Sequence, residues 1–177
     1  MKKVLLISMS ILIFSCQSNK SESKKDTAQS NIEKSIKPNL NNPESYEFVK
    51  LTLIDSTSYS DNIESRIEMF KTSLDRQKDL KESESVLYNS EDLKMYDRYL
   101  ISIDSIKKEM GTKGNDAAAY TYIFEMRSNN AFGAKVKQEF YVQTTPEQEV
   151  LNVTEDKGGL YSTPNGFPGY DEMINNK

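Results

Sequence analysis

The sequence predicts an α+β fold in which an antiparallel sheet is packed by a helical pair. Two stretches, residues 60–80 and 90–110, repeat apolar side chains three and four positions apart, as on one face of a helix. Three shorter stretches alternate apolar and polar side chains, as half-buried strands do, and the apolar residues Val150, Leu151 and Val153 suggest a fourth strand. The predicted order is β-α-α-β-β-β, and short connections between the last three strands favour antiparallel pairing. Both helices are expected on one sheet face, because each buries its apolar stripe there.

The N-terminal residues have the layout of an export signal. Two lysines follow the initial methionine, and an almost unbroken apolar run covers residues 4–14. Ser15 then precedes Cys16, the only cysteine of the chain. The run is shorter than the roughly 20 residues that a membrane-spanning helix needs, so a secretory signal peptide is the better interpretation. With a cysteine directly after the cut, residues 1–15 resemble a bacterial lipoprotein signal peptide.

This resemblance implies that Cys16 becomes lipidated and that fatty acids such as palmitate anchor the protein in the membrane. The alternative is an ordinary secreted protein with an incidental cysteine. Gln17 follows the cysteine in place of the aspartate that retains some lipoproteins at the inner membrane, which favours the outer membrane.

The lipidated cysteine and the residues after it, 16–38, are expected to form a flexible tether. Polar residues dominate this segment, and Ile32 and Ile36 are its only strongly apolar side chains. Such a composition does not bury enough surface to offset the entropy lost on ordering, so we expect its removal to leave stability unchanged. An α+β domain is then expected over residues 39–154, with an irregular C-terminal tail over 155–177, where Gly, Pro and Asn are frequent.

The first predicted strand covers residues 46–54, where Val49, Leu51 and Leu53 alternate with polar residues. A turn and a helix follow. Ser60 or Asp61 is expected to cap the helix, and Glu64, three positions after Asp61, would complete a capping box. Its apolar stripe consists of Ile63, Ile67, Phe70 and Leu74.

The second predicted helix begins near Ser90 and ends at Gly111, which accepts the backbone conformation of a helix end. Leu100 and Ile103 are expected at the centre of its buried stripe, facing the sheet, and Asp104 on the exposed side. The whole apolar face comprises Leu93, Tyr96, Leu100, Ile103, Ile106 and Met110.

Three further strands are predicted over residues 120–127, 135–142 and 150–153. The reversal at 128–133 joins the first two of them and contains asparagines and a glycine, which tolerate a left-handed backbone. The sequence therefore predicts a β-hairpin at this point.

Composition limits the possible functions. The chain has 23 Lys and Arg against 27 Asp and Glu, for a net charge of −4, and no basic stripe. It is therefore a poor candidate for binding nucleic acid, and membrane contact is expected through the lipid on Cys16. With no histidine and one cysteine, the chain offers neither a Ser-His-Asp triad nor a Cys-His zinc site. We expect no enzymatic activity, no cofactor and no metal.

Two groups of carboxylates are possible sites. Asp97 and Asp104 lie seven positions apart on one helix, as a glycosidase pair could, but a solvated polar face explains them better. Asp55, Asp61 and Glu64 could offer oxygens to calcium, but they lack the spacing of a known calcium loop. Helix capping accounts for two of these three.

The best functional candidate is the reversal. An exposed Phe132 would contact a partner, and Arg127, Asn129 and Asn130 surround it in sequence. The plainer interpretation is a hairpin turn. An aromatic stripe on the neighbouring strands could line a groove, although such stripes more often belong to the core; its members are Tyr120, Tyr122, Phe124 and Phe140.

Two motifs, Asn42-Pro43-Glu44-Ser45-Tyr46-Glu47-Phe48 and Arg127-Ser128-Asn129-Asn130-Ala131-Phe132-Gly133, add to the lipoprotein start. Together they resemble a group of short, uncharacterised bacterial lipoproteins over about residues 41–154. The resemblance implies no activity, cofactor or catalytic residue. The architecture is loosely similar to cystatin-like and NTF2-like folds, which bear many functions.

The sequence thus predicts a lipid-anchored cell-envelope protein with a non-catalytic binding domain, whose partner is an envelope protein or a small ligand. The alternative is a periplasmic inhibitor or immunity-type protein that occludes a partner enzyme.

Overall fold

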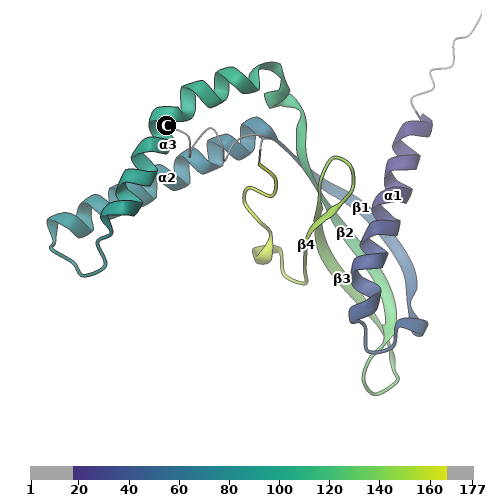
Figure 1. Cartoon of the computed structure of the whole chain (residues 1–177). Helices are drawn as coiled ribbons and strands as arrows, with labels where there is room; N and C mark the ends of the chain where they lie inside the picture. The colour runs from purple at the N-terminus through teal and green to yellow at the C-terminus, as the bar shows by residue number, and fades with distance from the viewer. Residues whose placement is uncertain (1–17, 167–177) are drawn as a thin grey trace, which may run out of the picture.

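The structure is a computed structural model that describes residues 18–166 (Figure 1). Within this range it contains three α-helices and one four-stranded antiparallel sheet, which confirms the predicted α+β class. In chain order the elements are α1 (Ser18–Ile36), β1 (Glu47–Ser58), α2 (Tyr59–Glu82), α3 (Ser90–Met110), β2 (Ala117–Asn129), β3 (Lys135–Thr144) and β4 (Val150–Thr154).

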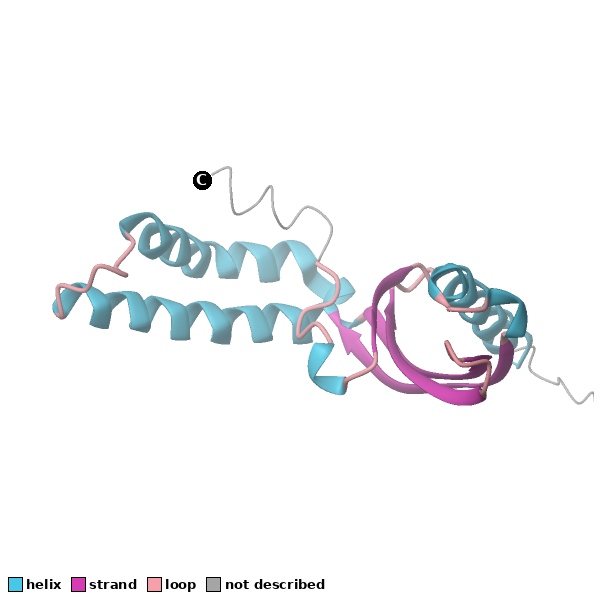
Figure 2. Ribbon diagram, turned by 90° about the horizontal axis from the view of Figure 1, so that it is seen from below, coloured by secondary structure: helices cyan, strands magenta, loops and turns pink. Residues whose placement is uncertain are grey.

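The strands follow one another across the sheet in the order β1-β2-β3-β4. Phe124 on the second strand pairs with Leu51 on one side and with Phe140 on the other, so apolar side chains form a row across one face. Register shifts next to Phe48 and Leu53 interrupt the pairing of β1. Such irregularities bend a strand, and the sheet is strongly curved (Figure 2).

Helix α1 covers the concave face of this sheet, so the prediction of a flexible tether over residues 16–38 is wrong where the structure describes it. Ala28, Ile32 and Ile36 are buried, and their spacing of four places them on one side of the helix. They pack into the same cluster as Leu51, Tyr122, Phe124, Met126 and Val142. The polar mean composition of the segment does not indicate this narrow apolar stripe. The stripe is sufficient to hold the helix in place, because the sheet supplies the rest of the core.

Helices α2 and α3 pack against each other and extend away from the sheet (Figures 1 and 2). Tyr99 and Ile106 lie at the centre of their own cluster, which also holds Ile63 and Met110. The expectation that this helical pair covers the sheet is wrong, because α1 already occupies the concave face. Leu100 is half-buried in the helical cluster and does not face the sheet.

The helix boundaries agree with local signals, with one correction. Gly111 ends α3 at φ +51°, as predicted. Helix α2, however, is capped by Ser58 and not by Ser60 or Asp61. The Ser58 hydroxyl accepts the Asp61 N–H, and the Asp61 carboxylate accepts the Ser58 N–H, which completes a capping box. Asp61 therefore stands three positions inside the helix.

The described part of the C-terminal tail, residues 155–166, is irregular as predicted, apart from one 3-10 turn at Lys157–Gly159. It docks on the sheet face opposite α1. The Gln143 side chain donates to the carbonyl of Tyr161 and accepts its N–H, both at 2.9 Å. Asn165 donates to the carbonyl of Ala118 at 2.9 Å. The rest of the predicted tail, 167–177, lies outside the described residues.

The predicted signal peptide and Cys16 also lie outside the described residues. Among the helices between residues 18 and 166, none combines the length and the apolar character needed to cross a membrane.

Candidate functional site

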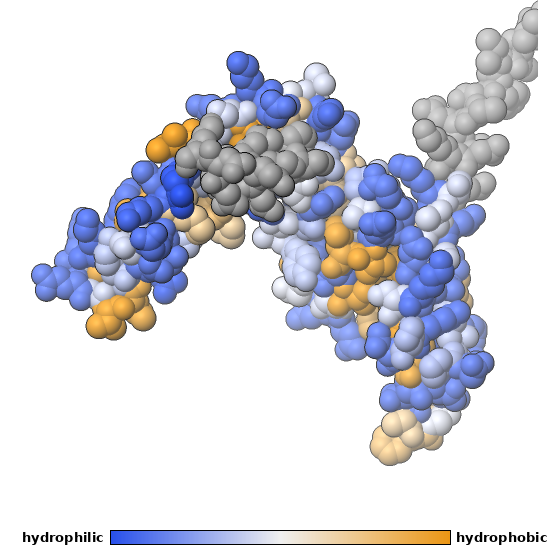
Figure 3. Space-filling view, in the orientation of Figure 1, coloured by the Kyte–Doolittle hydropathy of each residue, from blue (hydrophilic) through white to orange (hydrophobic). Residues whose placement is uncertain are grey.

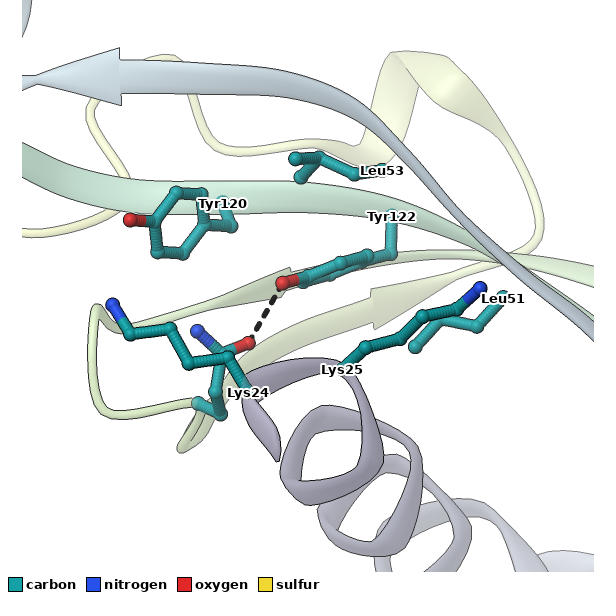
Figure 4. A pocket seen from close by; sticks show the side chains of 7 residues that line it. Lys24, Lys25, Leu51, Leu53, Tyr120 and Tyr122 are labelled. Atoms are coloured by element: carbon teal, nitrogen blue, oxygen red, sulfur yellow. Dashed lines mark hydrogen bonds between the residues drawn. The ribbon is translucent and has the colours of Figure 1, made fainter. Parts of the chain in front are cut away.

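A pocket of about 530 Å³ lies between the N-terminal half of α1 and the concave face of the sheet (Figure 4). Its lining combines apolar, hydroxyl and cationic side chains from four parts of the chain. They are Lys24 and Lys25 of α1, Leu51 and Leu53 of β1, Tyr120 and Tyr122 of β2, and Gln148 of the β3–β4 turn. Its volume falls in the range of about 300–1,000 Å³ that is usual for small-molecule sites.

The sheet supplies the apolar wall because of its pairing register. Leu53 pairs with Tyr122, which brings both side chains onto the concave face. Leu51 and Tyr120 belong to the same face, since side chains two positions apart share a face. Helix α1 packs nearest the β3–β4 side, where Asn31 contacts the turn between these strands. The pocket therefore opens between α1 and β1.

Gln148 forms a rigid corner of the pocket. Its side-chain oxygen accepts the Tyr122 hydroxyl at 2.8 Å, the contact drawn in Figure 4. Its amide group donates to the carbonyl of Pro146 at 3.2 Å, and its own carbonyl accepts the Asn31 side chain at 2.9 Å. Gln148 is 2% exposed and has φ +70°, a backbone conformation that persists only when the surroundings hold it. These contacts join α1, β2 and the β3–β4 turn at one residue.

The Tyr122 hydroxyl stays protonated and acts as a hydrogen-bond donor. Burial raises the pKa of this hydroxyl, and the neighbouring Tyr120 raises it further, while the hydrogen bond to Gln148 opposes the shift. A neutral donor bonded to a neutral amide stabilises the wall without adding charge to it.

The charge at the pocket comes from two lysines. The Lys24 ammonium lies 5.8 Å from the centre of the Tyr120 ring, within the range of a cation–π contact. Lys25 extends along the other side of the pocket toward Leu51 (Figure 4). Both side chains are exposed, and the described lining contains no carboxylate. The pocket therefore combines an apolar wall with a positive edge.

The predicted partner-binding loop lies at the far end of α1, where β2 turns into β3 (Figure 1). Phe132 is 95% exposed at its tip. Asn130 shapes the turn, because its side-chain oxygen accepts the N–H groups of Phe132 and Ala134, each at 3.0 Å. Gly133 takes φ +81°.

Besides Asn130, two more of the four predicted loop residues have structural roles. Arg127 forms an exposed ion pair with Glu47 at 3.4 Å, and the Asn129 N–H donates to the Ser45 hydroxyl at 2.7 Å. Lys135, and to a smaller extent Arg127, hold the pKa of Glu47 below its usual range. Phe132 is the one member of the four whose side chain extends into solvent without a described contact.

We expect Phe132→Ala to change the free energy of unfolding by less than about 0.5 kcal/mol, because the ring buries almost no surface. Gly133→Ala should cost about 1–2 kcal/mol, since a Cβ is strained at this positive φ. Urea denaturation of the two variants measures the difference. If Phe132→Ala proved the more damaging variant, the loop would have a folded-state contact that contradicts its exposure.

The aromatic stripe belongs partly to the core and partly to the pocket. Phe124 is fully buried in the sheet cluster, and Phe140 packs against that cluster. Tyr122 is buried too, yet it lines the pocket together with Tyr120. Phe124 and Phe140 therefore belong to the core, Tyr120 lines the pocket, and Tyr122 does both.

The carboxylates that were considered for catalysis or calcium are dispersed. Asp97 and Asp104 are exposed on α3, Asp55 lies on β1, and Asp61 and Glu64 lie in the first turns of α2. Over residues 18–166, no group of three or more His, Cys, Asp or Glu side chains is placed to hold a metal ion.

The sequence prediction includes Tyr120 and Tyr122 as possible groove residues and Leu51 and Leu53 only as strand residues, and it gives no role to Lys24, Lys25 or Gln148. The lysines fall in the segment that was interpreted as a tether, and a search for a weak four-residue repeat there would have placed them on a helix. No sequence signal indicates Gln148. Comparisons of the chain with protein-family models, with curated proteins and with solved structures find no match.

Proposed function

We propose that the protein is a cell-envelope lipoprotein, anchored through acyl chains on Cys16, whose α+β domain is a non-catalytic binding module. The pocket between α1 and the sheet is the observation that carries the binding role. It is open, it has a rigid corner at Gln148, and it presents an apolar wall with cationic side chains. These are features of recognition of a ligand, whereas paired acid and base groups are what a hydrolytic site would need.

The position of α1 supports the anchored arrangement. The helix begins at Ser18, two residues after Cys16, and two residues span at most about 7 Å. A lipid on Cys16 would hold the N-terminal end of α1 at the membrane surface, most simply that of the outer membrane. The pocket would lie at this anchored end. With 19 residues in α1, the Phe132 loop would lie about 30 Å farther from the membrane.

The anchor is tested by metabolic labelling with an alkyne-bearing palmitate analogue in the producing bacterium. The wild-type protein should incorporate the label and remain with the membrane fraction. Cys16→Ser should incorporate none, because the thiol that accepts the diacylglycerol is absent. Ser15→Ala, which keeps a small residue before the cysteine, is the matched control and should label like the wild type. Equal labelling of Cys16→Ser would refute the anchor.

A second candidate function is an inhibitor or immunity-type protein that occludes an envelope enzyme. The observation that favours it is Phe132, a large apolar side chain held in solvent by a hydrogen-bonded turn. Such preorganised loops lose little entropy on binding. An inhibitor should co-purify with one enzyme in equal amounts, and Phe132→Ala should abolish this association while leaving the fold intact.

A further inference from the structure

The pocket is an apolar recess in a mainly hydrophilic surface. In Figure 3 hydrophilic side chains cover most of the visible face, and apolar ones gather in a few places: beside α1, on the helical pair and at the two tips of the molecule. Leu53 lies on the pocket wall and is 53% exposed, although its side chain is large and apolar. An apolar ligand body that covered it would remove this surface from water.

The cationic edge restricts which apolar ligands fit. Lys24 and Lys25 lie at opposite sides of the two tyrosines (Figure 4). The chain has a net charge of −4, whereas the described pocket lining holds two ammonium groups and no carboxylate, which makes the pocket locally positive. An ammonium group can approach an anionic head group and donate up to three hydrogen bonds to it.

We propose that this pocket binds a single-chain amphiphile with an anionic head group, such as a fatty acid or an alkyl phosphate. The apolar chain lies along Leu51, Leu53 and the faces of the tyrosines, and the head group is bound by one of the two ammonium groups, that of Lys24 or that of Lys25, at the side of the tyrosines. The inference rests on the proposed binding role of the domain and names the chemical class of its ligand. Because the wall is held by Gln148 and Tyr122, the site needs little rearrangement to accept the ligand.

The proposal is tested with residues 17–177, a chain that retains every residue of both hydrophobic clusters. A fluorescent fatty acid, 11-(dansylamino)undecanoic acid, is titrated into the protein, and its displacement is followed with dodecanoate, dodecyl phosphate and dodecanol. Dodecanoate and dodecyl phosphate should both displace the probe. Dodecanol, which has the same chain without the charge, should do so about tenfold more weakly, since a charged hydrogen bond is lost.

Two variants locate the site. The double variant Lys24→Gln/Lys25→Gln should weaken dodecanoate about tenfold and leave dodecanol unchanged. Leu53→Glu should abolish binding of both, because it places a carboxylate on the apolar wall, and its exposed position spares the fold. The matched controls are Lys34→Gln, on an exposed position of the same helix, and Leu87→Glu, on the exposed turn between α2 and α3. Both should bind like the parent chain.

Three outcomes would overturn the proposal. The first is that the probe does not bind even at 100 times the protein concentration. The second is that dodecanoate and dodecanol compete equally well. The third is that Leu53→Glu binds dodecanoate and dodecanol as the parent chain does. If only one of dodecanoate and dodecyl phosphate displaced the probe, the head group would be a carboxylate or a phosphate respectively, and the result would support the proposal. None of these results bears on the labelling of Cys16, so failure of the ligand class and failure of the anchor are distinguishable.

Discussion

Replacing Ile32 with alanine should destabilise the protein by about 2–5 kcal/mol, although this residue lies in a segment of strongly polar composition. Its side chain is fully buried between α1 and the sheet. Truncation loses the transfer free energy of the removed carbons and leaves a cavity beside Phe124 and its neighbours. For a domain of this size the midpoint of thermal unfolding falls by about 2–4 °C for each kcal/mol, so a decrease of about 10 °C is expected.

Ser30→Ala is the control, because Ser30 lies two positions away on the same helix and is exposed. It should change the free energy of unfolding by less than about 0.5 kcal/mol. A chain that begins at Pro38 should fail to fold cooperatively, since the concave face then loses its entire cover. If Ile32→Ala and the shortened chain melted like the parent, α1 would not belong to the core, and the pocket would lose one wall.

Ile106→Ala should also cost about 2–5 kcal/mol, through the separate core between α2 and α3. Ile106 is fully buried, whereas Ile101 on the same helix is 71% exposed. The same substitution at Ile101 is therefore a matched control, with an expected change of less than about 0.5 kcal/mol. Urea denaturation followed by circular dichroism gives both values. Equal effects at the two positions would show that the face of α3 is assigned incorrectly.

The two hydrophobic clusters share no residue. The double variant Ile32→Ala/Ile106→Ala should then lose the sum of the two single effects, to within about 0.5 kcal/mol. A larger deviation would show that the helical pair and the sheet are coupled in the folded state, for example through the α2 cap at Ser58 that joins β1 directly to α2.

Local patterns in the sequence determined most secondary structure between residues 46 and 154. The alternating strands and the helix from Ser90 to Gly111 follow from patterns that need only near neighbours in the chain. The first strand was predicted too short, because Asp55–Ser58 reads as a turn although it pairs with β2. Cross-strand hydrogen bonds outweighed local turn preference there.

The tertiary structure decided which surfaces meet. An amphipathic pattern states that a helix has a face to bury, but it does not identify the partner of that face. For α2 and α3 the partner is the other helix. For α1 the four-residue repeat is weak, and Ala28, Ile32 and Ile36 become a core only because the sheet curves around them.

The candidate site depends on the same distinction. Its tyrosines were visible in the sequence as a stripe at strand spacing, and Phe132 as the tip of a predicted turn. The pocket itself joins residues as distant as Lys24 and Gln148. Their proximity is set by the packing of α1 on the curved sheet and by the hydrogen bond from Asn31 to the β3–β4 turn, and neither is encoded in a local sequence pattern.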